Sequence, residues 1–461
     1  MANIVGNNMS DLITTFNKYV KENEALAIEA FQELRRKTEE EDLLNINNKI
    51  PIFPRPGLIQ TDHLNKLAQD TETILNIITT IPERIFNHNI KEMCSHVGLS
   101  DQHYELVKQT YGANDGLMSR CDLFFEADHS YKFLEFNVDS SVGGLEIAAV
   151  NRVMEGIELY KSWNLNNDWK YDDPLKNLIS LIHHRVSEKN MENKLVTVAV
   201  IDWHTYIDGY IWSLNLIKEY LIEAGYNVIV CSQKDVELKD GYLCYQDQII
   251  DVVYRVFLSD DALENPREIQ PILDAYKENN LILLSGIHTE LYSNKTIFAL
   301  LSDPKYKDYY SEKEQEVIHR CIPWTRVLED TATTYEGREV NLINFIVENQ
   351  SDLVLKPALG YGGQSVTLGW NSSKEEWQKK VFSTLQSKER FIVQKRVVPV
   401  EEEMPKLDEN GISFENVMLN WGIYVFDGRF SGSMLRGLTT TDHGIINAAQ
   451  GASMTCVFYR D

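Results

Sequence analysis

Four polar residues in one aromatic, alternating segment of the chain are spaced so that they could bind a metal ion. If residues 127–130 form the turn of a β-hairpin, Asp122 lies directly opposite Glu135, and Arg120 lies opposite Asn137. Residues two apart on a strand share a face, so all four side chains are expected on one side. Opposed carboxylates repel each other unless a cation lies between them, and hard divalent ions prefer carboxylate and amide oxygens. The spacing leaves two interpretations open, a metal site and a solvated hairpin face.

A strand followed at once by a glycine-rich turn could bind phosphate groups. The apolar residues 353–355 carry Lys356 inward, and the turn comes directly after it. The candidate residues of the turn are Gly360, Gly362, Gly363, Gln364 and Ser365. Glycines let backbone N–H groups wrap a phosphate chain, and a buried ammonium needs an anion to stay charged. A surface lysine before an ordinary Pro-Gly loop is the alternative.

Three further positions could contribute groups to a nucleotide site. Lys295 precedes a predicted helix, and Arg436 alternates with apolar residues on a strand that could face phosphates. A strand end at 394–397 exposes backbone donors and acceptors that can bind an adenine edge, and Glu401 beyond it could accept ribose hydroxyls. The candidate residues here are Gln394, Lys395, Val397 and Glu401. Each of these positions is equally compatible with an ordinary surface role.

The hydrophobic pattern predicts the elements that must position these residues. Apolar residues recur at helical spacing between residues 10 and 110, which indicates helices. From residue 194, buried strands alternate with helices, which is typical of a parallel sheet. Its strands are expected at 195–201, 228–231, 250–257 and 281–285. No Gly-x-Gly-x-x-Gly motif occurs in this layer, so a dinucleotide site is not expected there. An α+β region follows residue 290.

Composition narrows the possible functions. The chain has 461 residues, 43% of them hydrophobic, which predicts two or three globular cores. Its formal net charge is −24, which disfavours binding to nucleic acid or to an anionic membrane surface. The first residues carry no secretory signal pattern, and no apolar run is long enough to span a bilayer. The six cysteines are scattered, as is typical of reduced thiols, so a cytoplasmic location is expected.

Taken together, these segments resemble the ATP-grasp superfamily of carboxylate–amine ligases. The matching motifs are Lys295, Ile322-Pro323, Lys356 with its glycine turn, the strand end 394–397, Arg120-x-Asp122 and Glu135-x-Asn137. In the common order the metal-binding hairpin comes last, whereas here it comes first. The chain is therefore similar to the circularly permuted ATP-grasp group that contains the glutathionylspermidine synthetase-like proteins. The resemblance covers residues 115–461, and the adenine strand carries Gln394 where many relatives have Glu.

The resemblance implies a mixed α/β and α+β architecture. This is a circularly permuted ATP-grasp fold with a Rossmann-like pre-grasp layer and a helical N-terminal segment. The expected division is a helical segment at 1–110, a metal-binding part at 111–165, a pre-ATP-grasp domain at 166–290 and a nucleotide-binding domain at 291–461. The hairpin is expected to lie beside the strands at 391–397 and 423–439.

The resemblance also implies ATP and two magnesium ions, an acyl phosphate, and release of ADP and phosphate. Asp122, Glu135 and Asn137 would hold the metal. Lys295, Lys356 and Arg436 would bind phosphates, and Arg120 would bind the acyl phosphate or the incoming carboxylate. The substrates would be a carboxylate and an amine, either small molecules or groups on a peptide or carrier protein. A small-molecule kinase, a nucleotide-binding module without turnover and a partner-docking protein remain alternatives, and the oligomeric state stays open.

Overall fold

The structure, a computed structural model, describes residues 2–40, 45–46, 48–112, 116–139, 142–165, 168–191, 193–360, 362–363, 365–440, 445–447 and 450–461. The helices are α1 (Ala2–Glu22), α2 (Glu24–Glu40), α3 (Thr61–Arg84), α4 (Ile90–Val97), α5 (Asp101–Thr110), α6 (Ile147–Gly156), α7 (Glu158–Leu165), α8 (Pro174–Glu188), α9 (Ile207–Glu223), α10 (Ser259–Glu264), α11 (Gln270–Lys277), α12 (Glu290–Ser293), α13 (Thr296–Ser302), α14 (Glu312–Cys321), α15 (Leu342–Glu348) and α16 (Lys374–Leu385). The first strands are β1 (Asn45–Ile46), β2 (Asn48–Lys49), β3 (Gly57–Gln60), β4 (Met118–Phe125), β5 (Tyr131–Asn137), β6 (Thr197–Asp202), β7 (Asn227–Ser232), β8 (Val236–Lys239), β9 (Tyr242–Tyr245), β10 (Gln248–Ile249), β11 (Val252–Arg255) and β12 (Ile282–Leu284). The others are β13 (Thr325–Val327), β14 (Ala332–Tyr335), β15 (Arg338–Asn341), β16 (Leu353–Pro357), β17 (Thr367–Leu368), β18 (Phe391–Lys395), β19 (Glu401–Asp408), β20 (Gly411–Phe426), β21 (Arg429–Thr439) and β22 (Ser453–Arg460).

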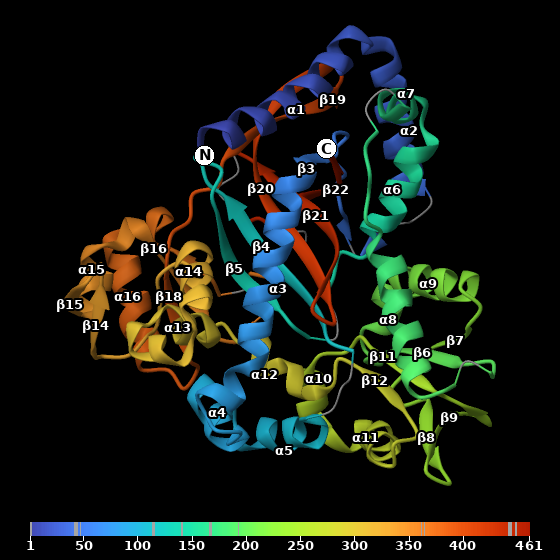
Figure 1. Ribbon diagram of the computed structural model, residues 1–461, viewed down its shortest axis with the longest axis vertical. Coiled ribbons are helices and arrows are strands. Elements are labelled where there is room, and N and C mark those ends of the chain that lie inside the picture. Colours follow the sequence, from blue (N-terminus) through green and yellow to red (C-terminus); the bar gives the residue numbers. More distant parts are fainter. Residues whose placement is uncertain are drawn as a thin grey trace.

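The largest sheet joins strands from both halves of the chain. Its order is β3-β22-β21-β20-β4-β5, with β19 paired to β20. The β4–β5 hairpin therefore lies beside the late hairpin β20–β21, as expected from the sequence (Figure 1). The strand near 391–397, which was also expected beside the hairpin, belongs to a different sheet and does not pair with it. That strand, β18, already pairs with β13 on one edge and β16 on the other, so neither edge is free.

The long helix α3 packs across this sheet, and its apolar stripe explains why (Figure 1). Leu67, Ile74 and Ile78 recur at helical spacing, and all three are fully buried. Asp70 lies on the same buried side, and its Oδ2 accepts a 2.6 Å hydrogen bond from the hydroxyl of Tyr131, the first residue of β5. The helix thus contacts the β4–β5 hairpin as well as the sheet behind it.

The Rossmann-like layer is confirmed as a four-stranded parallel sheet. Its order is β12-β11-β6-β7, and every residue of β6 is buried. These strands fall on the apolar runs predicted from the sequence, because a strand covered on both faces needs apolar side chains on both. A second antiparallel sheet, in the order β13-β18-β16-β17, carries Lys356 on β16.

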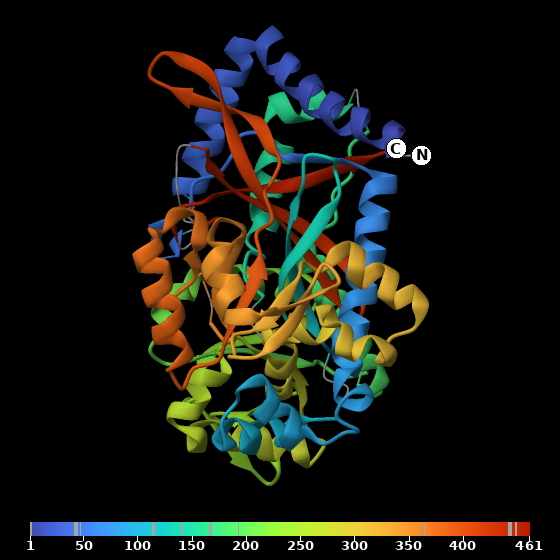
Figure 2. The same cartoon turned by 90° about the vertical axis from the view of Figure 1, so that its left-hand side faces the viewer.

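Two strands of the largest sheet were not predicted. The acidic run after residue 400 is strand β19, and its hairpin with β20 projects beside α1 (Figure 2). This run can form a strand because its side chains alternate in burial, and buried Glu402 pairs with Arg55 at 2.6 Å. Strand β3 lies within the expected helical segment but pairs with β22 in the largest sheet. Among the described residues, no helix combines the length and the apolar character needed to cross a bilayer.

Candidate functional site

A cavity of about 450 Å³ lies between the β4–β5 hairpin and the sheet that carries Lys356. The sequence-predicted residues that line it are Asp122, Glu135, Lys295, Lys356, Gly360, Gly363, Gln394, Lys395, Val397 and Arg436. They come from β4, β5, β16, β18 and β21 and from the start of α13, so the fold brings together residues from distant parts of the chain.

The hairpin register is as predicted, although the turn differs. Asp122 faces Glu135, and Arg120 faces Asn137. The Glu126 N–H donates to the Ser130 carbonyl at 2.8 Å, so the loop is one residue shorter than the assumed turn. A bulge at Leu134 restores the register. The carbonyl oxygen of Leu134 lies 3.3 Å from Lys356 Nζ, so the bulge also supplies an acceptor to the cavity.

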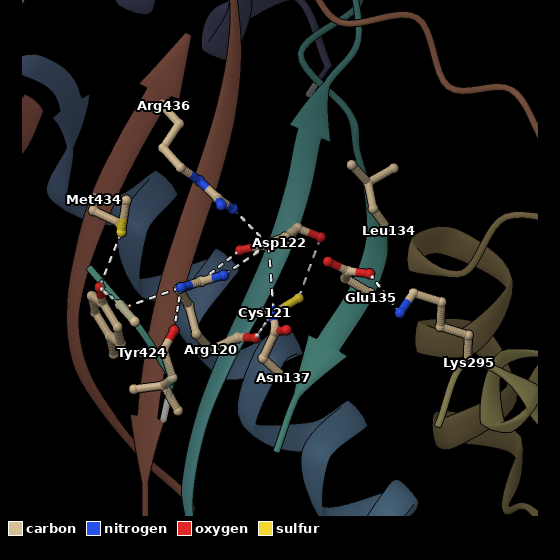
Figure 3. Close-up of polar contacts among 12 residues, drawn as sticks. Arg120, Cys121, Asp122, Leu134, Glu135, Asn137, Lys295, Tyr424, Met434 and Arg436 are labelled. Atoms are coloured by element: carbon tan, nitrogen blue, oxygen red, sulfur yellow. Dashed lines mark hydrogen bonds and ion pairs between the residues drawn. The ribbon is translucent and has the colours of Figure 1, made fainter. Parts of the chain in front are cut away.

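Asp122 is held by two arginines (Figure 3). Arg120 donates to its two oxygens from Nε and Nη2, at 2.8 and 3.1 Å, and Arg436 Nη2 lies 2.6 Å from Oδ2. Burial works to raise the pKa of Asp122, but these guanidinium groups outweigh it and hold the pKa at about 2. Asp122 is therefore charged at neutral pH.

Glu135 is paired with a lysine from another segment. Lys295 Nζ lies 3.2 Å from Glu135 Oε2 and also donates to the Gly360 carbonyl at 2.9 Å (Figure 3). Burial and Asp122 act to raise the pKa of Glu135, but Lys295 and Lys356 outweigh them, and the pKa lies below its ordinary value. The repulsion expected between the opposed acids is thus relieved by the protein's own cations, so repulsion alone does not require a metal.

Gln394 lines the cavity, and its side chain holds Lys356. Lys356 Nζ donates to Gln394 Oε1 at 2.8 Å, and Gln394 Nε2 donates to Thr325 Oγ1 at 3.1 Å. Gln394 is buried, and its amide carries no charge that could offset the ammonium. Burial accordingly lowers the pKa of Lys356 to about 8, against the attraction of Glu135.

The donor set fits a hard divalent ion such as magnesium. The carboxylates of Asp122 and Glu135 both line the cavity, and the Asn137 amide lies beside Asp122, with Nδ2 3.4 Å from Oδ2. Asn420, which lines the same cavity, has a buried Oδ1 without a hydrogen-bond partner among the residues that the structure describes. Carboxylate and amide oxygens are the ligands that such ions prefer. The sequence analysis did not single out Asn420. The one feature that could have revealed it is that it is a lone amide in a strand of mainly apolar residues.

Several predicted residues do not line the cavity. Arg120 and Asn137 contact Asp122 instead, and Gly362 and Ser365 are not among the lining residues. Gln364 lies outside the described residues. Glu401 is exposed on β19 and lines a separate cavity near α1, so the structure does not bring it to the expected ribose position.

Residues that the sequence did not single out complete the cavity. Apolar or aromatic lining comes from Phe124, Val354, Leu368, Trp370, Met418, Ile445 and Ile446, and further amides come from Asn371 and Asn447. Gly422 faces Asp122 on β20. A Cβ at this position would lie 3.0 Å from Arg120 Cδ and 2.9 Å from Met434 Cγ, so the glycine leaves the space that Arg120 occupies.

Comparison with known proteins agrees with this arrangement. The sequence matches the family model described as "Glutathionylspermidine synthase preATP-grasp" over residues 58–441. A glutathione synthetase-like effector from Globodera pallida, solved in its apo form, has a similar fold, with a TM-score of 0.62 and 11% identity over 95% of this chain and 97% of that chain. A candidate gamma-glutamylcysteine synthetase from Methylobacillus flagellatus KT has 11% identity over 83% of this chain and 87% of its own, with a TM-score of 0.42. The search of curated proteins finds no match.

Proposed function

Because the chain belongs to the glutathionylspermidine synthase pre-ATP-grasp family, we propose that it is an ATP-dependent ligase that joins a carboxylate to an amine through an acyl phosphate. ADP and phosphate are the other products. The observation that carries this proposal is the cavity in which Lys295, Lys356 and Arg436 lie with the acids of the β4–β5 hairpin. Three cations and two carboxylates around one cavity suit a metal-bound triphosphate better than any neutral ligand.

The proposed roles follow from the contacts. Lys356 and Lys295 bind phosphate oxygens, and their present partners are neutral carbonyl or amide groups and Glu135. Arg120 donates hydrogen bonds to Asp122 from two of its nitrogens, so its proposed role is to position that carboxylate. Magnesium on Asp122, Glu135 and Asn137 would neutralise charge on the transferred phosphoryl group. The apolar lining around Trp370 suits a nucleotide base.

The proposal includes the circular permutation and the division of the chain. The hairpin at 118–137 would be the metal-binding part, and the segments from residue 291 onward would bind the nucleotide. The four-stranded parallel sheet would serve as the pre-grasp layer that helps to bind the substrate. This division accounts for why one cavity draws on β4 and β5 as well as on β16, β18 and β21.

A substrate screen tests the proposal. Amino acids, peptides and polyamines are supplied with ATP and magnesium, and substrate-dependent ADP release is measured together with amide formation. With the acid labelled at its carboxylate oxygens, one labelled oxygen is expected in the released phosphate. Unlabelled phosphate alongside an amide would overturn the acyl phosphate. ADP with a stable phosphorylated product would indicate a kinase, and nucleotide binding without turnover across the screen would indicate a binding module.

A further inference from the structure

Away from the nucleotide cavity, three helices bring together side chains that can ligate a metal. His103 comes from α5, Asp260 from α10 and Glu290 from α12. His103 Nε2 lies 3.5 Å from Asp260 Oδ1 and 3.8 Å from Glu290 Oε1. One candidate ligand atom from each side chain lies within 4.8 Å of the other two. Within the described residues, this is the group of three His, Cys, Asp or Glu side chains that meets this condition.

Glu290 is the unexplained member of this group. Its side chain is 1% exposed, and neither carboxylate oxygen has a hydrogen-bond partner among the described residues. His103 Nε2 likewise has no hydrogen-bond partner in the described part of the chain. Burial raises the pKa of Glu290 well above its ordinary value, with Asp139 and Asp260 adding to the rise and Arg255 opposing it. Buried polar groups without partners are rare in folded proteins, and a bound ion is one of their ordinary explanations.

We propose that His103, Asp260 and Glu290 form a binding site for a first-row divalent transition metal ion, with Zn²⁺ or Mn²⁺ as its occupant. An ion about 2.0–2.2 Å from each ligand atom holds neighbouring ligands about 3–3.5 Å apart, so the two separations from His103 Nε2 need only a small contraction. An imidazole nitrogen beside two carboxylates favours these metals over magnesium, which prefers oxygen ligands alone. The Asp260 side chain is 56% exposed, so an ion and a completing water can enter from solvent.

The surroundings of His103 allow this coordination at a moderate cost. Its Nδ1 lies 2.7 Å from Ser100 Oγ and accepts from the Ser100 N–H at 3.2 Å. Metal at Nε2 puts the ring proton on Nδ1, where it can donate to the Ser100 hydroxyl as an outer-shell partner. The hydrogen bond from the Ser100 N–H is given up in exchange. We therefore expect a weaker site than a structural zinc centre with four protein ligands.

The consequence is a clamp across three helices. An ion here would tie α5 and α10 to α12, which is in turn packed against β5 of the metal-binding hairpin. Lys295 follows α12 directly in the sequence. An ion that binds only the folded chain raises its stability by mass action, whether or not the ligase reaction is correct.

Calorimetric titration of the full-length, chelator-treated protein with Zn²⁺ and Mn²⁺, in excess magnesium and without nucleotide, tests the site. One ion is expected to bind, with a rise in Tm. Asp260→Asn changes an exposed side chain, so the variant should fold, and its affinity should fall by about tenfold or more. Glu290→Gln should abolish binding, because an amide is a much poorer ligand for these ions than a carboxylate, and it should change the Tm of the metal-free protein little.

Two variants serve as matched controls. His184→Gln removes an exposed histidine whose Nε2 lies 3.6 Å from Glu188 Oε1, and it should leave Zn²⁺ binding unchanged. Glu135→Gln should also retain Zn²⁺ binding while it impairs the proposed ligase site, so the two proposals fail separately. Absence of binding would overturn the metal site, as would equal binding in wild type, Asp260→Asn and Glu290→Gln. An unchanged Tm in Glu290→Gln without any ion binding to wild type would identify a protonated carboxyl instead.

Discussion

Lys356 is the residue at which charge and position are most closely linked. Its ammonium is tethered by neutral acceptors, Gln394 Oε1 and the Leu134 carbonyl, so its charge is not cancelled by a directly bonded carboxylate. A glutamate at position 394 would place a negative charge on this lysine. The glutamine therefore keeps the positive charge available for a phosphate, at the cost of a pKa lowered by burial to about 8.

Nucleotide affinity should consequently fall as pH rises through about 8. Below this pKa Lys356 is an ammonium that attracts phosphates, whereas above it each binding event must also take up a proton. The dissociation constant for ADP should then increase by up to about tenfold per pH unit. Lys356→Arg stays charged and should show a flat profile over the same range. Lys395→Arg, at a half-exposed lysine of the same cavity, should keep the wild-type slope; equal slopes in all three proteins would contradict the assignment.

Glu135→Gln should separate stability from catalysis. From the hairpin spacing alone, Glu135→Gln would be expected to raise the free energy of unfolding, because it removes repulsion from Asp122. The substitution also removes the ion pair with Lys295, so we expect the free energy of unfolding to fall instead. We expect a loss of about 1–2 kcal/mol in the free energy of unfolding, measured by urea denaturation. Turnover should fall by about 100-fold or more, because the carboxylate would hold the cation where phosphoryl charge develops. Asp128→Asn, at an exposed acid in the turn of the same hairpin, should leave both values near wild type; unchanged turnover in Glu135→Gln would exclude the hairpin as the metal site.

Residue types predicted the cations and acids of the cavity better than its polar contacts. The charge of a lysine or an acid is known from its residue type alone, so Lys295, Lys356 and Asp122 could be identified as candidates without a structure. The prediction for Gln394 concerned the backbone of its strand end, which stays a prediction; the hydrogen bond between its side chain and Lys356 was not foreseen. Glu401 was expected at a ribose because it is a carboxylate that follows the strand end. A run of three glutamates does not reveal which of them is buried, and in β19 Glu401 is exposed whereas Glu402 is buried. The role of a neutral amide such as Asn420 depends on which face of the strand it occupies.

Among the elements, the β4–β5 hairpin shows how a correct register can rest on an incorrect turn. The turn assumed from the sequence is one residue too long, and the bulge at Leu134 adds the missing residue back. A bulge has no sequence signature as clear as that of a glycine turn, so the sequence could not predict this one. The predicted pairing of Asp122 with Glu135 is correct because the bulge compensates for the shorter turn. Parallel strands were easier to predict, since burial on both faces demands uninterrupted apolar runs.

Strand β20 has no side chain at Gly422, which leaves room for the side chain of Arg120. Alanine there would place Cβ about as close to Arg120 Cδ as to Met434 Cγ, 3.0 and 2.9 Å away, so one of them must move. We expect Gly422→Ala to lower the free energy of unfolding by about 1–3 kcal/mol and to reduce turnover through a displaced Arg120. Gly156→Ala is the control, because its new Cβ would meet only Lys37 Nζ at 3.9 Å. A variant at Gly422 with native Tm and native turnover would show that Arg120 tolerates the shift.

At the scale of the whole molecule, an acidic chain builds one cavity rich in cations. The net charge is −24, yet Lys295, Lys356, Lys395, Arg396 and Arg436 line the same space. These lysines and arginines come from segments that follow the parallel sheet in sequence, whereas the acids come from residues 118–137, which precede it. This cavity forms only when the sheet that contains β4 and β5 is packed against the sheet that contains β16 and β18. A bound ligand should therefore stabilise both sheets together.

Hydrogen exchange with and without ADP and magnesium is the direct test of this assembly. Nucleotide should protect amides in β4–β5 and in β16–β18 together, although more than two hundred residues separate them in the sequence. At about 100 times Kd the ligand should also stabilise the folded chain by about 2.7 kcal/mol. The outlying β8–β9 hairpin, which contributes no residue to the cavity, should exchange at the same rate in both states. Protection confined to β16–β18 would mean that the early hairpin does not take part in nucleotide binding, and the permuted arrangement would have to be given up.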